Sequence, residues 1–346
     1  MKPYKELTRL GRLRRIRKLA ELALKGYGLS GARLTFLHSG GNIIFRVDVP
    51  GNVPVRKEKS PFLENRYVMR VLTTSHFDGV ESELVFLDAM RKADLPVPAP
   101  VPKLDGKLLT TIITPGVPAG RIVSLMRWVD GRRLSQGLRP AHFKALGQMI
   151  ARLHEFSESW QPPDDFERPI WDWEGQLGGK YFEDPIEELI ASMPRKFQEP
   201  FKIVSGKARE VMQELGKGTN AYGLIHSDLY PENLLFKAGE VFPIDFEDCG
   251  YGYWIWDMAP PLSIAPWTVE WGWIRDALLE GYSKIRTLPD KQLRHLDLFI
   301  ATHCATMVLW ASMFIKNDPA MQTEYEKWRN REGNKLLHYF EHGKGN

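Results

Sequence analysis

The sequence has few cysteines and no pattern typical of a bound metal cluster. Its 346 residues include two cysteines, Cys249 and Cys304, and no Cys-x-x-Cys pair. Two cysteines are too few for the disulfide framework of a small secreted domain, and no Cys/His cluster indicates a zinc site. The sequence therefore favours a reducing compartment, and we expect a cytoplasmic protein.

Long hydrophobic runs are also scarce. One stretch, residues 298–315, has no charged residue over 18 positions, but it contains Thr302, His303, Thr306 and Ser312. A membrane span needs about 20 predominantly apolar residues, so we expect a buried helix here and no transmembrane segment. The first residues lack the uninterrupted apolar core of a secretory signal.

The excess of positive charge is confined to the start of the chain. The net charge is +4, yet residues 1–25 hold nine Lys and Arg against two Glu, so the rest of the chain is slightly acidic. Apolar residues recur at helical spacing between Leu10 and Leu24, which predicts a basic amphipathic helix within residues 1–30, attached to the first domain. Such a face can contact nucleic acid or anionic lipid. A solvated helix is the simpler interpretation, and we do not expect a nucleic-acid partner.

What the sequence does contain is ample material for a core. Its apolar content is 43%, with 17 Phe, 11 Tyr and 11 Trp, and its length suggests about two domains. Residues 31–128 have the pattern of a strand-rich domain with a single main helix near Val80–Met90, which the proline run at 96–102 ends. The strands are expected at 33–37, 43–49, 67–72, 107–113 and 121–128.

After residue 129 the pattern becomes mostly helical. Helices are expected at 141–156, 198–215, 270–285, 291–315 and 319–342, with short strands near 222–226, 234–237 and 241–245. Residues 157–185 are interpreted as a loop-rich insertion. We therefore predict an α+β protein with a small antiparallel-sheet domain at 31–128 and a larger, mostly helical domain at 129–346.

Residues 224–247 contain the densest group of side chains able to do chemistry. A predicted strand ends at His226, a polar loop follows, and a short hairpin then leads to Asp245. Two such connections can bring Asp228, Asn233 and Asp245 to one rim of a cleft. Phosphoryl transfer requires such a set, because one carboxylate orients the acceptor hydroxyl and hard oxygen ligands hold Mg²⁺.

The motif His226-Ser227-Asp228-Leu229-Tyr230-Pro231-Glu232-Asn233 is similar to the catalytic loop H-R-D-L-x-x-x-N of the protein-kinase fold, and Asp245-Phe246-Glu247 to its D-F-G. Ser227 and Glu247 depart from that pattern. Asp257-Met258-Ala259 begins only 12 residues after Asp245, which leaves little room for a phosphorylatable activation segment. Together these features resemble the aminoglycoside phosphotransferase and choline kinase family, which includes type II homoserine kinases and phosphorylates hydroxyl groups of small molecules.

The resemblance implies a bilobal, protein-kinase-like fold that uses ATP and Mg²⁺. Asp228 would be the catalytic base, and Asn233 and Asp245 would be the metal ligands. His226 and Asp257 would hold the catalytic loop rather than react.

In the small lobe, Arg70 occupies the position of the usual phosphate-binding Lys. Arginine is a competent phosphate binder, so we interpret it as a variant of an active enzyme. Its expected partner is Glu83, with Glu81 as the alternative. The turn Ser39-Gly40-Gly41-Asn42 would cover the phosphates, although a plain hairpin turn explains the same residues. Met126 and Trp128 would line the adenine slot.

The acceptor is the least determined part of the prediction. Glu247 and Asp248 would favour a cationic acceptor or assist the metal, and Trp254 belongs to an aromatic group that could bind an ammonium ion or pack in the core. We therefore expect an ATP-dependent O-phosphotransferase for a small hydroxylated molecule that can carry an amine. The alternatives are a Ser/Thr protein kinase of the same fold and a nucleotide-binding pseudokinase; the intact Asp228, Asn233 and Asp245 argue against the latter. The sequence does not indicate an oligomeric state.

Overall fold

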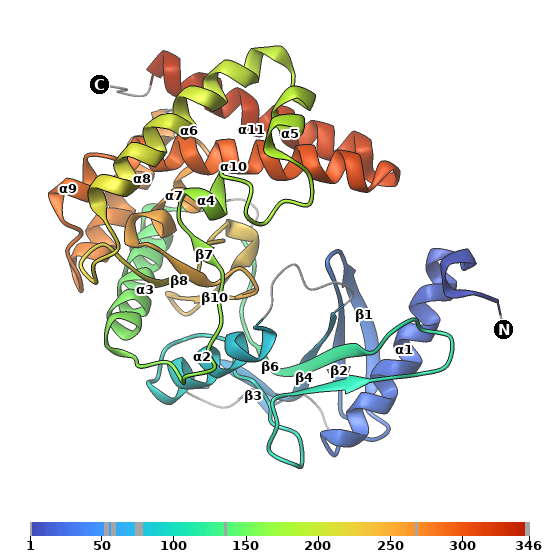
Figure 1. Ribbon diagram of the computed structural model, residues 1–346. Helices are drawn as coiled ribbons and strands as arrows, with labels where there is room; N and C mark the ends of the chain where they lie inside the picture. Colours follow the sequence, from blue (N-terminus) through green and yellow to red (C-terminus); the bar gives the residue numbers. More distant parts are fainter. Residues whose placement is uncertain are drawn as a thin grey trace. The chain divides into compact units, whose positions relative to one another are not determined.

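The chain forms two compact units in a computed structural model that describes residues 2–51, 55–56, 60–72, 79–134, 137–266 and 269–342. The first unit comprises Met1–Arg132, Pro162–Glu167 and Phe242–Ile244; the second comprises Arg133–Gln161, Arg168–Val241 and Asp245–Asn346. An antiparallel sheet dominates the first unit and helices dominate the second (Figure 1). The predicted fold class is thus confirmed.

The first unit is built on a six-stranded antiparallel sheet with the order β1-β2-β4-β6-β5, in which β3 also pairs with β4. The register between β4 and β6 shifts between Leu63 and Tyr67, where Asn65 has a φ of 61°. The strands are β1 (Arg33–Ser39), β2 (Asn42–Asp48), β3 (Val55–Arg56), β4 (Phe62–Leu72), β5 (Leu109–Ile112) and β6 (Arg121–Val129).

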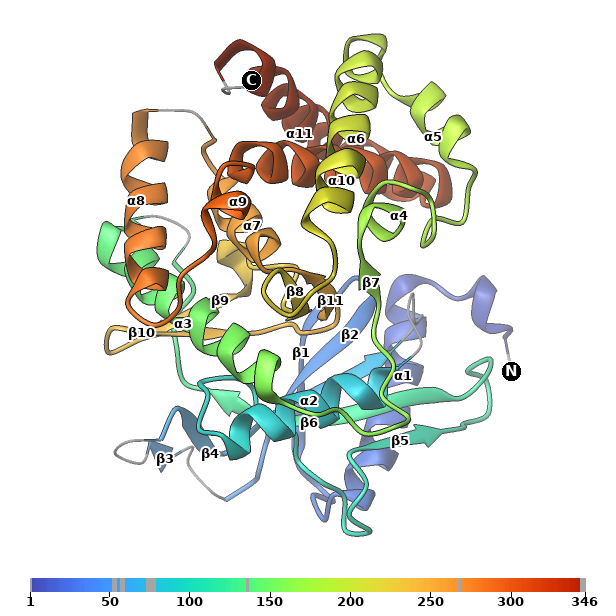
Figure 2. The same cartoon turned by 60° about the vertical axis from the view of Figure 1, so that its left-hand side comes forward.

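Strand alternation divides this sheet into two faces that carry different helices. Met69 and Val71 of β4 are buried in one hydrophobic cluster with residues of helix α1 (Arg9–Gly26). Arg70 lies between them, so its side chain is on the other face, where it contacts helix α2 (Val80–Lys92). Figure 2 shows α1 and α2 on opposite sides of the sheet.

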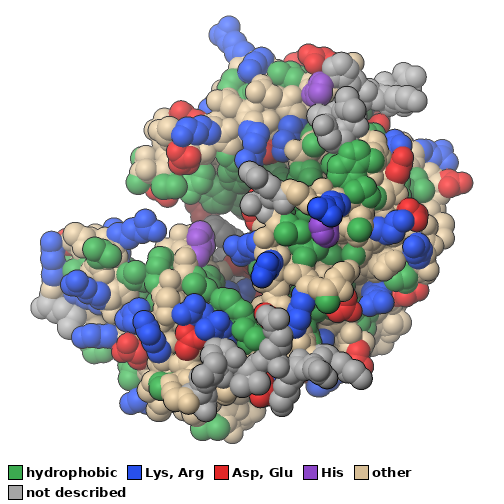
Figure 3. Space-filling view, turned by 180° about the vertical axis from the view of Figure 1, so that it is seen from behind, with side chains coloured by type: hydrophobic (Ala, Val, Ile, Leu, Met, Phe, Trp, Pro, Cys, Tyr) green, Lys and Arg blue, Asp and Glu red, His purple; other side chains and the backbone are tan. Residues whose placement is uncertain are grey.

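Helix α1 follows a 3-10 turn, η1 (Tyr4–Glu6), and is capped by Thr8, whose hydroxyl accepts from the N–H of Gly11 at 3.2 Å. Its buried positions are Ile16, Leu19, Ala20, Ala23 and Leu24. Its exposed positions include Arg9, Arg12, Arg14, Lys18 and Lys25, and Lys and Arg side chains gather over this part of the molecule in Figure 3. The helix therefore has one face in the core and one basic face in solvent.

The second unit has a helical core around α10 (Leu296–Asn317). This helix is long and apolar enough to cross a membrane, with a mean hydropathy of 1.8, but 78% of its most apolar stretch is buried among its neighbours. We therefore assign it as a core helix. The other helices are α3 (Pro140–Ser159), α4 (Trp173–Gln176), α5 (Ile186–Ser192), α6 (Arg195–Leu215), α7 (Ala259–Leu262), α8 (Val269–Ser283), α9 (Asp290–Leu293) and α11 (Gln322–His342), with 3-10 turns η2 (Pro231–Asn233), η3 (Trp254–Met258) and η4 (Pro319–Met321).

Helices α3 and α8 pack closely through two glycines. A Cβ atom at Gly147 would lie 2.0 Å from the carbonyl oxygen of Leu278, and one at Gly281 would lie 2.0 Å from that of Lys144. Both neighbours are backbone atoms, so neither could be moved by a side-chain rotation. The two helices can approach this closely because glycine occupies both positions.

Two small sheets in this part of the chain flank the loops that contain Asp228 and Asp245. β8 (Tyr222–Ile225) pairs antiparallel with β11 (Gly250–Tyr253), which also pairs parallel with β7 (Ile170–Trp171). β9 (Leu234–Lys237) and β10 (Glu240–Pro243) form a separate hairpin. The loop that contains Asp228 follows β8, and Asp245 lies between β10 and β11.

Candidate active site

The loop after β8 places Asp228 and Asn233 in direct contact. The Nδ2 atom of Asn233 donates to Asp228 Oδ2 at 2.6 Å and to the Asp228 carbonyl at 3.1 Å. Pro231 begins the 3-10 turn η2, which ends at Asn233 and carries this residue back toward Asp228. Two predicted site residues, five positions apart, are thus held as a pair.

The environment of Asp228 favours its protonated form more than water does. Partial burial of the carboxyl raises its pKa well above the ordinary value, and the negative charge of Asp245 raises it further. The hydrogen bond from Asn233 acts in the opposite direction. Asp228 therefore accepts a proton more readily than an exposed aspartate, which suits a group that takes the proton of an acceptor hydroxyl.

Asp257 anchors the start of this loop. Its carboxylate is fully buried and accepts from the backbone N–H of Ser227 at 2.7 Å and from that of His226 at 2.9 Å. Ser227 has a φ of 73°, a conformation that non-glycine residues rarely adopt. The two hydrogen bonds hold the chain in this conformation immediately before Asp228.

The imidazole of His226 is fully buried at the same place. Its Nδ1 accepts from the N–H of Asp228 at 3.3 Å, and its ring lies 4.3 Å from that of Phe246. His226 thus contacts both the loop of Asp228 and the residue after Asp245.

His154 of α3 extends the anchor in a way that the sequence does not signal. Its Nε2 lies 3.1 Å from Asp257 Oδ2 and its Nδ1 lies 3.0 Å from the hydroxyl of Tyr282. Complete burial lowers the pKa of His154, so the ring is neutral. An ionised Asp257 can only accept; we therefore assign the proton to Nε2 and a hydrogen bond from the Tyr282 hydroxyl to Nδ1.

Asp245 lies two residues after the end of β10, with an exposed side chain and a φ of 66°. The carbonyl groups of the next residues accept hydrogen bonds from Arg168 and Trp171. These two residues belong to the segment that the sequence suggested to be a loop-rich insertion. No local pattern marked them, because their partners lie more than 70 positions away along the chain.

The residues present fit a magnesium ion. Because the Nδ2 atom of Asn233 is directed toward Asp228, its carbonyl oxygen can serve as one ligand, and Asp245, after the next hairpin, can supply a carboxylate. In the described part of the chain no three His, Cys, Asp or Glu side chains are grouped as a complete metal cage. Magnesium in phosphoryl-transfer sites is commonly bound by one or two carboxylates together with substrate phosphates, so a small oxygen set suffices.

In the first unit, Arg70 and Glu83 form a buried, two-pronged ion pair. Arg70 Nη1 donates to Glu83 Oε1 at 3.0 Å and Nη2 donates to Oε2 at 2.5 Å; the two side chains are 7% and 2% exposed. Glu81, the alternative partner, is an exposed residue of the same helix. The pairing expected from the sequence is therefore present with Glu83, while the contact of Arg70 with a phosphate stays a prediction.

The turn Ser39-Gly40-Gly41-Asn42 joins β1 to β2, with the N–H of Gly40 donating to the carbonyl of Asn42 at 3.0 Å. A Cβ atom at Gly41 would meet no atom within 4 Å, so space is available beside this turn. Met126 and Trp128 lie in β6, paired with Val68 and Leu63 of β4. The phosphate and adenine contacts of these residues stay predictions.

Of the acceptor candidates, Trp254 lies in the core. Its indole is fully buried, donates to the carbonyl of Thr219 at 2.9 Å and packs against His154 at 4.7 Å. This burial gives Trp254 a packing role and keeps it from an acceptor. Glu247 and Asp248 are partly exposed beside Asp245 and remain candidates.

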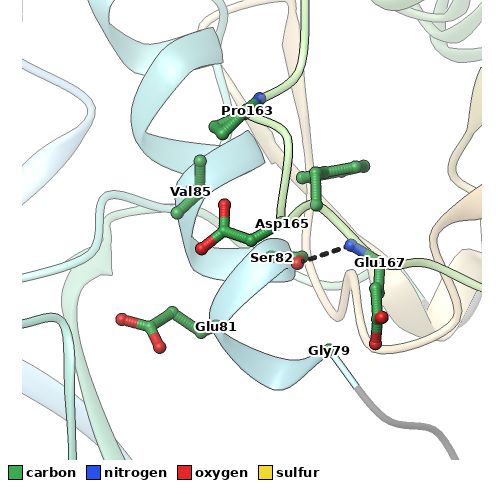
Figure 4. Close-up of a pocket in the computed structure, with 8 residues that line it drawn as sticks. Gly79, Glu81, Ser82, Val85, Pro163, Asp165 and Glu167 are labelled. Carbon is green, nitrogen blue, oxygen red and sulfur yellow. Dashed lines mark hydrogen bonds between the residues drawn. The ribbon is translucent and has the colours of Figure 1, made fainter.

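A small pocket of about 130 Å³ lies within the first unit, at the start of α2 (Figure 4). The Ser82 hydroxyl accepts from the N–H of Glu167 at 2.9 Å at this pocket, and Glu81, Asp165 and Glu167 are among its lining residues. Of the residues considered for the site, only Glu81, the alternative partner of Arg70, lines this pocket, and we assign no ligand to it.

Comparison with known proteins gives consistent matches. The sequence profile of the phosphotransferase enzyme family matches residues 55–292. The solved structure of a microcompartment-associated aminopropanol kinase is 25% identical, with a TM-score of 0.76, and covers 94% of this chain and 98% of that chain. The amicoumacin kinase of Bacillus subtilis strain 168 is 24% identical over 257 residues, 73% of this chain and 68% of the relative. The homoserine kinase of Sinorhizobium medicae strain WSM419 is 24% identical over 237 residues, 64% of each protein.

Proposed function

This chain belongs to the phosphotransferase enzyme family, and from that premise we propose that it transfers the γ-phosphoryl group of ATP to a hydroxyl of a small molecule that carries an amine. The resemblance drawn from the catalytic loop is confirmed at the level of the family. The proposal depends mainly on the hydrogen-bonded pair of Asp228 and Asn233. The carboxylate of Asp245 is close enough to that of Asp228 to raise its pKa.

Four residues have separate roles in the proposed phosphoryl transfer. Asp228 orients the acceptor hydroxyl and receives its proton as the acceptor oxygen bonds to the γ-phosphorus and the bond from that phosphorus to ADP, the leaving group, breaks. Asn233 holds the Asp228 carboxylate in place through Nδ2 and offers its own oxygen to the metal with Asp245. When bound, Mg²⁺ would neutralise charge on the ATP phosphates. Arg70, buried with Glu83, supplies a fixed cation for the phosphates in the first unit.

The amine in the proposed acceptor is suggested by the related enzymes. Two of these enzymes are named for aminopropanol and homoserine, and each of these compounds combines an amine with a hydroxyl. Glu247 and Asp248 provide carboxylates next to Asp245 that would attract an ammonium group. We therefore place short amino alcohols and hydroxy amino acids first among the acceptors to test.

The test is ATP consumption with a panel of short amino alcohols, homoserine and choline, using Asp228→Asn as the blank. A positioned base contributes about 10²–10⁴-fold, so this variant should lose about that factor in kcat with the true acceptor while it still binds nucleotide. Glu240→Gln, which removes an exposed acid from the neighbouring strand β10, is the matched control and should turn over like the wild type. Full turnover by Asp228→Asn would contradict the assigned role.

A further inference from the structure

Four consecutive carbonyl groups follow Asp245, and each one accepts a hydrogen bond from residues 168–171. Arg168 Nε donates to the carbonyl of Cys249 at 2.6 Å, and Nη2 donates to that of Glu247 and, at 3.5 Å, to that of Phe246. The indole Nε1 of Trp171 donates to the carbonyl of Asp248 at 2.6 Å. Two side chains thus bind the backbone of every residue from 246 to 249.

The backbone of the same segment supports the continuation of this loop. The N–H of Tyr251 donates to the carbonyl of Pro169 at 2.8 Å, and Tyr251 pairs with Ile170 between β11 and β7. A Cβ atom at Gly250 would lie 2.5 Å from the Pro169 oxygen, so the two backbone segments are in contact without an intervening side chain. The loop after Asp245 is therefore attached to residues 168–171 along its whole length.

An arginine is suited to this position and a lysine is not. Arg168 is only 9% exposed, and its planar guanidinium presents several N–H donors in a fixed fork. One fork can reach carbonyls of three different residues at once. An ammonium group on a flexible stem carries the same charge but cannot reproduce that arrangement.

The loop needs external support because of the backbone at Asp245. Its φ of 66° lies in the left-handed region, which a residue with a side chain occupies only when its surroundings hold it there. The carbonyls fixed by Arg168 and Trp171 begin with the next residue. Fixing them determines the direction in which the chain leaves Asp245, and with it the direction of the carboxylate.

We propose that Arg168, assisted by Trp171, is a positioning residue that aims the carboxylate of Asp245 at the metal. The inference rests on the proposed function, because it assumes that Asp245 is a metal ligand. It extends that function by giving residues 168–171 a part in metal binding.

The test measures binding of Mn²⁺, a spectroscopic substitute for Mg²⁺, to the full chain with a non-hydrolysable ATP analogue, by electron paramagnetic resonance. The variants are Arg168→Lys, which keeps the charge and loses the fork, and Trp171→Phe, which keeps a ring and loses the N–H. Lys217→Ala is the control, because Lys217 forms an exposed ion pair with Asp172, one residue beyond this segment. Thermal unfolding is recorded for each protein.

Loss of a group that orients a metal ligand typically weakens metal binding by about 10–100-fold, and we expect a loss of that size for Arg168→Lys. Trp171→Phe should lose less, because it frees one carbonyl of four, and Lys217→Ala should match the wild type. If Arg168→Lys does not fold, the loss in Trp171→Phe decides the question. Folded variants that bind Mn²⁺ like the wild type, whatever their unfolding temperatures, would overturn the proposal. Failure of the wild type itself to bind Mn²⁺ with the nucleotide would overturn the proposed function and, with it, this inference.

Discussion

Replacement of Asp257 by Asn should destabilise the second unit strongly, although the change in shape is minimal. The Asp257 carboxylate is fully buried and accepts three hydrogen bonds, from the N–H groups of Ser227 and His226 and from His154. An amide presents one oxygen and one NH₂ group. At least one N–H donor would therefore face another donor, in a place that water does not reach.

The magnitude follows from that count. A hydrogen bond to a charged group contributes about 1.5–3 kcal/mol, and an unsatisfied buried donor costs about 1–3 kcal/mol. With Oδ1 kept on Ser227, the NH₂ group replaces the acceptor of both His226 and His154, so the expected loss is about 2–5 kcal/mol. Native proteins are stable by only about 5–15 kcal/mol, so this is a large fraction of the total.

The assay is equilibrium unfolding in urea, followed by tryptophan fluorescence, with Asp276→Asn as the control. Asp276 is exposed and paired with its neighbour Arg275, and surface changes of this kind stay within about 0.5 kcal/mol. In turnover, Asp257→Asn should lower kcat, because Ser227 and His226 precede Asp228 directly. An unfolding free energy within about 0.5 kcal/mol of the wild type would refute the reasoning, since the hydrogen bonds would then contribute no net stability.

Two further predictions concern packing and pH. Gly147→Ala should lower the free energy of unfolding by about 3 kcal/mol or more, because its Cβ would lie 2.0 Å from a backbone oxygen. Gly206→Ala in α6, whose Cβ would meet no atom within 4 Å, should raise it by about 0.5–1 kcal/mol. Unfolding curves that rank the two variants the other way would contradict this. Burial and the charge of Lys335 lower the pKa of His303 from 6.5 to about 3. Between these two pH values His303 is protonated in the unfolded chain and neutral in the folded chain. The stability due to neutral His303 is complete above pH 6.5 and is lost as pH falls toward 3, by up to about 1.4 kcal/mol per pH unit; His303→Gln should flatten the measured slope, and an unchanged slope would refute the assignment.

Local sequence patterns were sufficient to predict most strands and helices of the fold. The strands expected at 33–37 and 121–128 occur as β1 and β6 with boundaries shifted by two residues or fewer, since alternation and glycine or proline limits are local signals. β4 begins at Phe62 rather than near Tyr67, because the irregular pairing around Asn65 interrupts its alternation. The two-residue strand β7 has no periodicity to detect and depends on its pairing with β11.

The site was predictable where its residues are close in the sequence. Asp228 and Asn233 belong to one motif, and the structure brings them into contact. The contacts of His154 with Asp257 and of Arg168 with Cys249 join residues 103 and 81 positions apart, and a single sequence contains no signal for such pairs. The aromatic group after Asp245 was ambiguous for a similar reason. Whether Trp254 faces a ligand or the core depends on tertiary packing, and it faces the core.

The stretch between Asp245 and Asp257 has a consequence for control of the enzyme. Strand β11 begins at Gly250 and the turn η3 follows it directly, so the stretch is built into the core of the second unit. Its only hydroxyl groups are those of Tyr251 and Tyr253, and the latter is buried and donates to the carbonyl of Met212 at 2.6 Å. A regulatory kinase would find no accessible serine or threonine here to modify. We therefore expect that phosphorylation of serine or threonine does not act at this stretch, in contrast to the activation segment of protein kinases.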